Sequence, residues 1–421
     1  PRINHRQQYS RLRWCYQHLS WTENDWSNVI FTDESNFEIL NRKDRIYIRR
    51  FRNDLKRFER SQPQVHKCGG VGIWSYPTCH GLGPIVFYDG SLNSDKYTDI
   101  LDQHLPTAHE KFLPQSPLNI PANAIWKQNG VTIAGGNVGG GATNKLNNPG
   151  GLFVDDDETV VIADLSNHRI MQWKNGDITN GQVVAGGKGR GDGLHQLNCP
   201  TDVLIDKETD SLIICDPGNR RVVRWSRHSG TTQGEVLIGN IACWGLAMDK
   251  QRYLYVSDYV KHEIRRYQLG EKNGTLAAGG NGKGNGLSQL NVPRYLFVDR
   301  QQNVYISDNN NHRVMKWNKG AKEGIVVAGG QGVGNALTQL SHPDGIFVDT
   351  LDTLYVADSW NHRVMRWTPG DKKRGTVIVG VNGGGKGENQ LSVPFGLSFD
   401  RQGRLYVADN NNDRIQRFSI E

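Results

Sequence analysis

The sequence predicts a mainly β protein in which residues 126–421 form a six-bladed β-propeller behind a shorter, truncated α/β segment. Three observations support this fold class. A unit of roughly fifty residues recurs six times, each unit holds strand-like runs in a constant order, and one further run stands unpaired ahead of the first unit. Short antiparallel sheets repeated at such a period are typical of propellers.

Each unit is marked by an Asp that ends an apolar run and is followed nine residues later by an aromatic residue. These residues are Asp164, Asp216, Asp258, Asp308, Asp358 and Asp409. Their spacings are 52, 42, 50, 50 and 51 residues. A period of this length indicates repeated structural units rather than one aperiodic core.

The order of runs within a unit predicts a four-stranded blade. An apolar run ending in Asp, such as IFVD, is followed by YVAD, then by HRVMRW, then by a run such as GIVVAGG. Runs of four to seven apolar or alternating residues between Gly, Asn and Asp are typical of buried antiparallel strands. The pattern leaves no room for a competing helix period.

Counting the strands predicts that the ring is closed. The last unit, from Phe395 to Ile420, supplies three strands, and residues 130–136 (GVTIAGG) supply a fourth one ahead of the first unit. If these four pair, they complete a sixth blade and leave no open sheet edge. We therefore expect the strand 130–136 to pair with the C-terminal blade.

Composition limits the function classes. The 421 residues include 49 Gly and 15 Pro, which suits a turn-rich β protein. There is no apolar run near 18 residues and no signal peptide, so neither membrane insertion nor secretion is supported. The chain begins at Pro1, which we interpret as a fragment of a longer protein. A net charge of +7 is spread over both halves and favours no particular partner.

The six cysteines are scattered and form no CxxC pair. They are Cys15, Cys68, Cys79, Cys199, Cys215 and Cys243. We expect neither a zinc site nor a disulfide framework, and this cysteine usage favours a reducing, intracellular compartment. The sequence indicates no cofactor.

Two segments carry a family resemblance: YISDNNNHRVMKW (Tyr305–Trp317) and YVADSWNHRVMRW (Tyr355–Trp367). They resemble the NHL-repeat family, and the resemblance extends over about residues 125–421. It implies a six-bladed β-propeller. Relatives include partner-binding and RNA-binding domains of tripartite-motif ubiquitin ligases, sensor domains of receptor kinases and an amidating lyase, so the fold does not select a function. No RING-like Cys/His set accompanies the repeats, and ubiquitin ligase activity is not expected.

The repeated polar residues are best interpreted as scaffold. We expect each Asp to accept hydrogen bonds from the turn that follows it. The His residues that follow, and the Arg residues after them, should tie neighbouring strands together. They are His168, His262, His312 and His362, with Arg169, Arg221, Arg313, Arg363 and Arg414. A catalytic centre requires one unique constellation, whereas these residues recur.

Function should lie where the repeat symmetry breaks. The loop that leads into each blade usually reads GxGxxxxxQLxxP but shrinks to GNIACW (Gly239–Trp244) in the third unit. The first residues of the inner strands should surround the mouth of the channel, and they vary between units. The resulting candidates for partner binding are Asp202, Trp244, Arg294, Tyr295, Asp344 and Phe395. Exposed aromatic and Arg side chains are typical of interaction hot spots, although the same residues could simply pack the loops.

A basic residue precedes the aromatic in five units, namely Arg224, Arg266, Lys316, Arg366 and Arg417. A ring of such residues could contact phosphates, but a solvated strand edge is the simpler interpretation. The Gly-rich loops lack a following helix that would hold an anion at its N-terminus, so we do not interpret them as phosphate sites.

The N-terminal segment has a different pattern. Trp21–Leu40 places Asp33 at the end of an apolar strand, and Ile46–Arg50 and Gly69–Leu101 add strands and an amphipathic helix. FTDES and GGVGIW resemble the catalytic domain of mariner-type transposases over about residues 5–113. The resemblance implies an RNase H-like fold with a carboxylate triad (the DDE domain). We assign residues 1–113 to this fragment and 114–125 to a linker.

The resemblance places Asp33 at the first carboxylate of that triad. The second would be expected some ninety residues later, but between Gln103 and Val154 the only acidic residue is Glu110. Two-metal phosphoryl transfer requires several carboxylates around the same ions. We therefore expect no intact catalytic site, and Mg²⁺ would be a cofactor only of a complete transposase domain.

A basic cluster in this segment supplies the nucleic-acid candidates, with a solvated surface as the alternative. These candidates are Arg42, Lys43, Arg45, Arg49, Arg50, Arg52, Lys56 and Arg57. Three hypotheses follow. The first is a non-catalytic module that binds a protein or peptide on its loop face, the second is a DNA- or RNA-binding protein, and the third is a propeller lyase or hydrolase with a metal in its channel. The joined segments indicate either a fusion or a transposon insertion.

Overall fold

The structure is a computed structural model of the chain. It describes residues 120–421 apart from 122, 137–138, 175, 177–179, 228–229 and 370–373, and before them only the strand residues 33–42, 45–50, 71–75, 77–78, 81–82 and 86–89. The chain divides into two compact units, Pro1–Ser116 and Pro117–Glu421. Each unit is described by itself.

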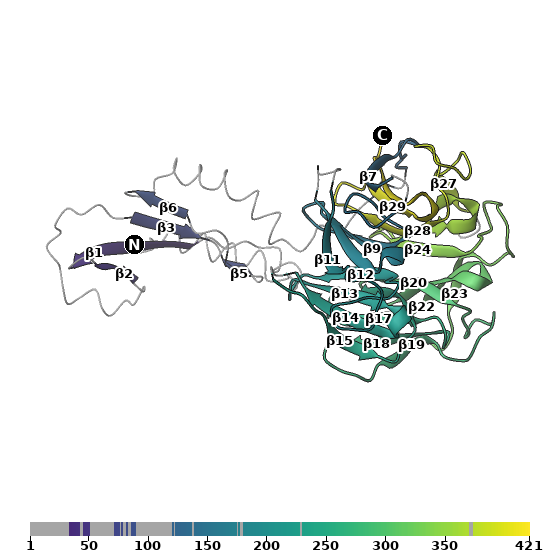
Figure 1. The fold of residues 1–421 in the computed structure, drawn as a ribbon, viewed down its shortest axis with the longest axis horizontal. Helices are drawn as coiled ribbons and strands as arrows, with labels where there is room; N and C mark the ends of the chain where they lie inside the picture. The colour runs from purple at the N-terminus through teal and green to yellow at the C-terminus, as the bar shows by residue number, and fades with distance from the viewer. Residues whose placement is uncertain are drawn as a thin grey trace, which may run out of the picture. The chain divides into compact units, whose positions relative to one another are not determined.

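The first unit contains a four-stranded antiparallel sheet and a two-stranded ribbon (Figure 1). The sheet has the order β2-β1-β3-β6, with β1 at Asp33–Arg42, β2 at Arg45–Arg50, β3 at Val71–Ser75 and β6 at Val86–Asp89. The ribbon pairs β4 (Pro77–Thr78) with β5 (Gly81–Leu82). Asp33 is the first residue of β1. The strand predicted ahead of it and the predicted helix lie outside the described residues.

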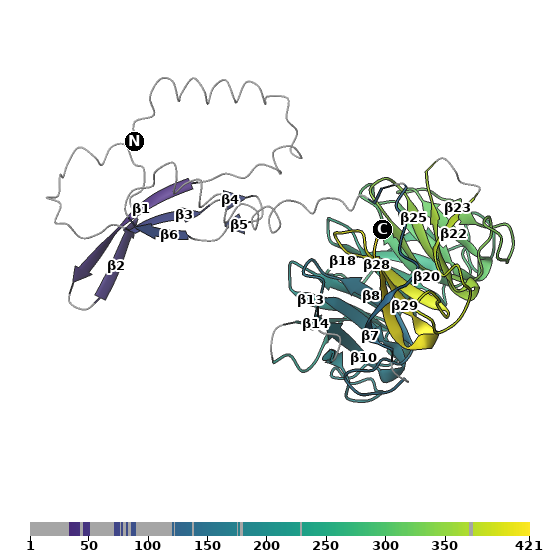
Figure 2. The same cartoon turned by 90° about the horizontal axis from the view of Figure 1, so that it is seen from above.

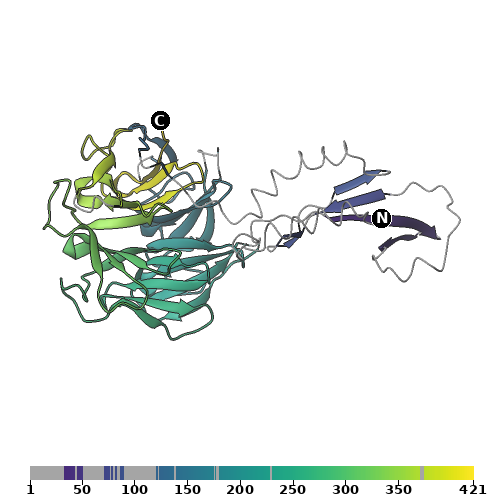
Figure 3. The same ribbon diagram turned by 180° about the vertical axis from the view of Figure 1, so that it is seen from behind.

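The second unit is a six-bladed β-propeller, as the repeat predicts (Figures 1 and 3). Every blade is one four-stranded antiparallel sheet. Blade 1 consists of β8 (Pro149–Val154), β9 (Val160–Asp164), β10 (Arg169–Trp173) and β11 (Gln182–Gly186). Blade 2 consists of β12 (Asp202–Asp206), β13 (Ser211–Asp216), β14 (Arg221–Ser226) and β15 (Glu235–Gly239). Blade 3 consists of β16 (Cys243–Met248), β17 (Tyr253–Asp258), β18 (Glu263–Gln268) and β19 (Thr275–Gly279).

The remaining blades repeat this arrangement. Blade 4 consists of β20 (Pro293–Val298), β21 (Val304–Asp308), β22 (Arg313–Trp317) and β23 (Ile325–Gly329). Blade 5 consists of β24 (Pro343–Val348), β25 (Leu354–Asp358), β26 (Arg363–Trp367) and β27 (Thr376–Val379). Blade 6 consists of β28 (Pro394–Phe399), β29 (Leu405–Asp409), β30 (Arg414–Phe418) and β7 (Val131–Gly135). Short 3-10 turns follow the second strand of five blades: η1 (Leu165–Asn167), η2 (Pro217–Asn219), η3 (Asn309–Asn311), η4 (Ser359–Asn361) and η5 (Asn410–Asn412).

The two ends of the propeller meet in blade 6, where β7 pairs with β30 in antiparallel register (Figure 2). The partners include Ile415 with Ala134 and Arg417 with Val131. An isolated antiparallel bridge between Trp126 and Ile420 extends the closure. Because β7 completes the sheet, β30 has a partner on both sides and no open edge.

Burial follows from the position of each strand in its blade. Five of the six second strands, such as β25 with the sequence LYVAD, are buried along their whole length because they face neighbouring blades on both sides. Most fourth strands begin exposed and become more buried toward their C-terminal end, as β19 does. Apolar side chains from adjacent blades form the core clusters, with fully buried Trp173 and Trp317 among the largest. No helix among the described residues is long and apolar enough to cross a membrane.

Part of the segment predicted as a linker packs on the propeller. Ile120 and Trp126 are both 1% exposed and join the core of blades 5 and 6. The indole N–H of Trp126 donates a hydrogen bond to the carbonyl of Gly403, 3.2 Å away. The compact unit thus includes residues ahead of the predicted propeller boundary.

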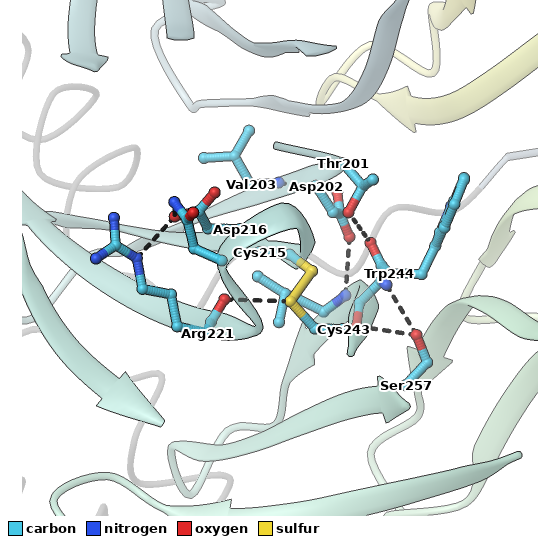
Figure 4. The surroundings of a disulfide bond; sticks show 12 residues. Thr201, Asp202, Val203, Cys215, Asp216, Arg221, Cys243, Trp244 and Ser257 are labelled. Atoms are coloured by element: carbon cyan, nitrogen blue, oxygen red, sulfur yellow. Dashed lines mark hydrogen bonds and ion pairs between the residues drawn. A yellow bond between two sulfur atoms is a disulfide. The ribbon is translucent and has the colours of Figure 1, made fainter. Parts of the chain in front are cut away.

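A disulfide joins Cys215 of β13 to Cys243 of β16 (Figure 4). The sequence analysis expected no disulfide framework, and it did not identify this single bond. The two residues lie 28 positions apart in sequence and belong to different blades, so their spacing alone does not indicate pairing.

Candidate binding site on the loop face

The repeated Asp and Arg residues form a buried ion pair in five blades. In each, the Arg Nε lies 2.7 Å from one carboxylate oxygen of the Asp that ends the second strand. The pairs are Asp164–Arg169, Asp216–Arg221, Asp308–Arg313, Asp358–Arg363 and Asp409–Arg414. We call this arrangement the Asp–Arg lock. Its carboxylates are fully buried, so the Arg partner compensates a charge that water cannot reach.

Each lock also fixes the loop that leads into its own blade, which we call the connecting loop. In blade 4, Arg313 donates from Nη1 to the carbonyl of Asn285 at 2.8 Å and from Nη2 to that of Gly286 at 2.9 Å. The other oxygen of Asp308 accepts the N–H of Asn291 at 2.6 Å. One ion pair therefore satisfies several backbone groups of a Gly-rich loop, which has few side chains of its own to hold it. Burial raises the pKa of Asp308, and its hydrogen bonds with Asn311 and Arg313 oppose that shift.

The repeated His residues join each blade to the next. At the junction of blades 1 and 2, for example, Nδ1 of His168 accepts the N–H of Cys199 at 3.1 Å. The same bond forms at three further junctions, through His262, His312 and His362. At the junction of blades 6 and 1, the carboxylate of Asp413 takes this role and accepts the N–H of Asn148 at 2.8 Å. A His or Asp side chain at this repeat position thus links one blade to the next at five of the six junctions.

Blade 3 breaks both patterns. Glu263 stands where the other blades have the lock Arg, and it pairs with Arg265 instead. Asp258 accepts turn N–H groups through Oδ1, while its Oδ2 has no hydrogen-bond partner among the described residues. The shortened loop GNIACW leads into this blade, and at the junction with blade 2 Arg220 occupies the repeat position of the junction His. The symmetry break predicted from the interval of 42 residues therefore coincides with the loss of a lock and of a His junction.

Four of the predicted candidates are in contact around the propeller axis: Trp244, Arg294, Asp344 and Phe395, which we call the mouth cluster. Each is the second residue of the first strand of its blade. The guanidinium of Arg294 lies 4.3 Å from the ring centroid of Trp244 and 5.7 Å from that of Phe395. Trp244 also packs edge-on against Tyr259 and Phe395. The cluster thus combines aromatic rings in edge-on contact with a cation that lies over two of them.

Asp344 lies beneath Arg294 and is completely buried. It accepts a hydrogen bond from Arg294 Nη1 at 2.8 Å and another from the hydroxyl of Ser359 at 2.8 Å. Burial raises the pKa of Asp344, and the charge of Arg294 opposes this shift. The ion pair orients the guanidinium against the aromatic rings, while Trp244, Arg294 and Phe395 remain partly exposed.

The other two candidates, Asp202 and Tyr295, lie inside the ring rather than on its rim, at 7% and 5% exposure. The Tyr295 hydroxyl donates to the carbonyl of Thr201, 3.3 Å away, and so links blade 4 to blade 2. Asp202 accepts the N–H of Leu246 in blade 3 at 2.8 Å. Burial raises the pKa of Asp202 to about 7, against the effect of two backbone N–H groups.

A comparison of the repeats explains why Asp202 and Tyr295 are buried inside the ring. Two residues after the Pro (Cys243 in blade 3) that leads into each first strand, four blades have Gly, namely Gly151, Gly245, Gly345 and Gly396. The other two blades have Asp202 and Tyr295 at this repeat position. A Cβ on Gly345 would lie 2.5 Å from the carbonyl oxygen of Phe395, because neighbouring first strands approach closely at the axis. The two larger side chains fill the space that remains between blades 2 and 4.

Two aromatic residues near the mouth cluster were missed by the sequence analysis. Trp360 in η4 is 62% exposed and stacks on His342, with ring centroids 4.0 Å apart. His342 in turn packs edge-on against His312. The backbone N–H of Trp360 donates a hydrogen bond to the carbonyl of Ser341. The η4 turn and the connecting loop of blade 5 therefore lie on the same face of the propeller. The signal was present in the repeat, since the position of Trp360 holds Ser166, Gly218, Val260, Asn310 and Asn411 in the other blades.

His342 should make the stability of the propeller sensitive to acid. Burial, followed by the charges of His312 and Arg294, lowers the pKa of His342 to about 4. The folded state therefore disfavours protonation that the unfolded chain accepts near pH 6.5. The stabilising contribution of neutral His342 is complete above about pH 6.5 and is lost as the pH falls toward 4. Because the imidazole is partly exposed, we expect a loss of about 1 kcal/mol between pH 7 and pH 5.

The matched variant is His342→Val, because Val292 and Val393 occupy the same left-handed position with φ of 56° and 53°. The free energy of unfolding is measured with guanidinium chloride at pH 7, 6 and 5. The difference in this free energy between wild type and variant should shrink as the pH falls. A constant difference would show that His342 does not titrate on unfolding in this range.

The basic residues that precede each aromatic do not form a free ring. Arg224 pairs with Glu235 at 2.6 Å, Lys316 lies 3.9 Å from Asp299, and Arg366 donates to the carbonyl of Ala124 at 3.0 Å. Lys316 also lies over the ring of Tyr305, and Arg266 over that of Tyr253. These contacts fit the interpretation as solvated strand edges better than a phosphate-binding ring.

Half of the nucleic-acid candidates in the first unit lie in strands that the structure describes. Arg42, Arg45, Arg49 and Arg50 lie on the β1–β2 hairpin, where Arg42 pairs with Arg45 and Glu38 with Arg49. Lys43, Arg52, Lys56 and Arg57 lie outside the described residues. In the part of the chain that the structure describes, no three His, Cys, Asp or Glu residues are grouped to hold a metal ion. Where the resemblance would place a second carboxylate, the chain already packs Ile120 and Trp126 into the propeller.

Comparison with known proteins agrees with this division. Residues 340–366 and 391–418 match the model of the NHL repeat. The last two blades of the propeller contain NHL repeats. Among solved structures, an auxiliary nutrient binding protein from Bacteroides thetaiotaomicron is similar with a TM-score of 0.55 and 16% identity, covering 84% of each chain. One from Bacteroides ovatus has a TM-score of 0.54 and 15% identity, covering 71% of this chain and 78% of that chain. At these identities the similarity shows the fold alone.

The N-terminal segment matches transposases in part. The Tcb1 transposase of Caenorhabditis briggsae is 30% identical over 103 residues, which cover 24% of this chain and 38% of that protein. The Tc1 transposase of Caenorhabditis elegans is 25% identical over 103 residues with the same coverage. The chain thus spans well under half the length of the curated relatives it matches. The molecule is a six-bladed β-propeller whose last two blades match the NHL repeat, and its N-terminal segment is similar to part of a transposase.

Proposed function

We propose that the propeller is a non-catalytic interaction module that binds a protein or peptide partner on its loop face. The observation that carries this proposal is a set of exposed and partly exposed aromatic side chains on blades 3, 5 and 6, together with Arg294 of blade 4. It comprises Trp360 with His342 at one end and the mouth cluster with Tyr259 at the other. Trp and Arg are the residues most often found to dominate binding energy at protein interfaces.

The repeats themselves provide the control for this argument. Asn310 and Asn411 build the turn of η3 and η5 at the position of Trp360, so the turn does not require an indole. Likewise, Gly150 and Thr201 occupy in blades 1 and 2 the repeat position that Trp244 holds in blade 3. Large aromatic side chains at positions where small or polar residues suffice for the fold indicate a role outside folding.

A peptide library displayed on phage and selected against the full-length protein tests the proposal. Peptides that bind wild type should bind Trp360→Asn at least tenfold more weakly, because the variant removes the exposed indole and installs the residue of two other blades. Leu351→Asn is the matched control, since Leu351 is 45% exposed on the turn between the first two strands of blade 5. It should retain affinity within about twofold. Selected peptides that bind both variants equally would refute a site on the loop face.

The β1–β2 hairpin keeps nucleic-acid binding as a second candidate function, because four Arg residues lie on its two strands. Fluorescence anisotropy with single-stranded and double-stranded oligonucleotides at 50 and 200 mM salt separates the two functions. Binding through phosphates should weaken steeply with salt and should not depend on Trp360. Among the described residues, no grouping favours the lyase or hydrolase with a channel metal.

A further inference from the structure

The junction between blades 2 and 3 is built differently from the other five. Elsewhere a His or Asp side chain at the end of one blade accepts a backbone N–H of the next connecting loop. Arg220 stands at this position in blade 2, and here the chain instead places the Cys215–Cys243 disulfide. The covalent bond and the missing hydrogen bond therefore coincide at one junction.

The disulfide joins positions that have other residues in the remaining blades. Cys243 replaces the Pro that begins the first strand elsewhere, as in Pro293 and Pro343. Cys215 stands before the lock Asp of blade 2, where blades 1, 5 and 6 have Ala163, Ala357 and Ala408. Cys215 and Cys243 are both completely buried, so the bond lies inside the interface between blades 2 and 3.

The next residue after Cys243 is Trp244 of the mouth cluster (Figure 4). Its carbonyl accepts the hydroxyl of Thr201 at 2.7 Å, and the following N–H, of Gly245, donates to Ser257 at 2.8 Å. Blade 3 has neither the Asp–Arg lock nor a long connecting loop to fix the start of β16. The bond to Cys215 is thus the covalent restraint nearest to the indole.

We infer that the Cys215–Cys243 disulfide replaces the missing lock and junction of blade 3 and positions Trp244 for binding on the loop face. The part concerning binding rests on the proposed function, whereas the structural replacement does not. Each sulfur loses one proton and one electron to a disulfide oxidant when the bond forms. The inference therefore also requires that the chain folds where such an oxidant is present.

Three measurements on the full-length protein test the inference. Proteolysis of the unreduced protein followed by mass spectrometry should yield one peptide pair linked through Cys215 and Cys243. The double variant Cys215→Ala, Cys243→Ala should melt about 5–10 °C lower, because the closed loop of 28 residues is released. It should also bind the selected peptides at least tenfold more weakly.

The control is Cys199→Asn. Cys199 is the free cysteine of the propeller, and Asn148 occupies its position in blade 1. This variant should keep the melting temperature within about 2 °C and leave peptide affinity unchanged. If the double variant does not fold, wild type unfolded and refolded with and without dithiothreitol provides the comparison, and refolding that is equally complete in both would contradict the inference.

The outcomes separate the two proposals. If no peptide is recovered on wild type, the proposed function fails, while the linked peptides and the melting temperature still decide the structural replacement. If peptides bind wild type and the double variant equally, the positioning role is refuted although the function stands. The absence of a Cys215–Cys243 linked pair would overturn the inference as a whole.

Discussion

Replacing Arg363 with Ala is expected to lower the free energy of unfolding by about 3–5 kcal/mol. The variant leaves Asp358 completely buried without the guanidinium that lies 2.7 Å from its carboxylate. It also removes the donor to the carbonyl of Asn335 at 2.8 Å, so the connecting loop of blade 5 loses one of its attachments. Guanidinium unfolding followed by far-UV circular dichroism measures the change.

The same repeat position provides the control. Glu263 occupies the place of the lock Arg in blade 3, and its partner Arg265 is 31% exposed. Glu263→Ala should therefore cost no more than about 1 kcal/mol. Arg363→Lys should give an intermediate loss, since it keeps the charge but cannot make the forked hydrogen bonds. Equal losses for Arg363→Ala and Glu263→Ala would show that the lock does not contribute to stability.

The fold could be predicted because each of its decisive features recurs. The Asp at the end of the second strand and the aromatic nine residues later locate every blade, and residues 130–136 indicate the strand that β7 provides at Val131–Gly135. The role of the lock could be predicted only in outline. Arg313 was expected to tie strands together, but most of its hydrogen bonds go to carbonyls of a Gly-rich loop, and backbone acceptors have no sequence signature.

The sequence indicated which strand positions form the candidate site, but it did not indicate which of their side chains are buried. The second residue of each first strand was correctly placed around the axis, yet Asp344 is buried under Arg294 because its carboxylate neutralises that cation. Which side chains point inward depends on how the six strands share the space at the axis. The Gly residues opposite Asp202 and Tyr295 were the available signal, because they mark the positions where neighbouring strands approach too closely for a Cβ.

The disulfide and Trp360 were missed for a different reason. Cysteine spacing was judged along the chain, whereas Cys215 and Cys243 meet across a blade interface. In a repeat protein the informative comparison is between equivalent positions of different units. That comparison shows Cys243 in place of Pro, directly after the shortened third connecting loop, and Trp360 where the other blades have small, polar or aliphatic residues.

Closure of the ring predicts a large effect for a substitution in β7, which lies far in sequence from β30, the strand with which it pairs. Ala134→Pro removes the N–H of Ala134 from the ladder that β7 forms with β30, opposite Ile415. It also places a ring at a residue that is 1% exposed. We expect a loss of at least about 3 kcal/mol, because an unpaired carbonyl and a steric conflict are introduced in a buried sheet.

Ala328→Pro makes the same change in blade 4, where Ala328 pairs with Val314 in the middle of the chain. If the ring is closed by β7, the two variants should lower the guanidinium midpoint to a similar extent, and both should unfold in a single transition. In an open array the residues around Ala134 would be peripheral, and Ala134→Pro would leave the midpoint nearly unchanged while Ala328→Pro remained destabilising. The comparison of the two midpoints therefore measures how strongly the first strand of the propeller holds its last blade.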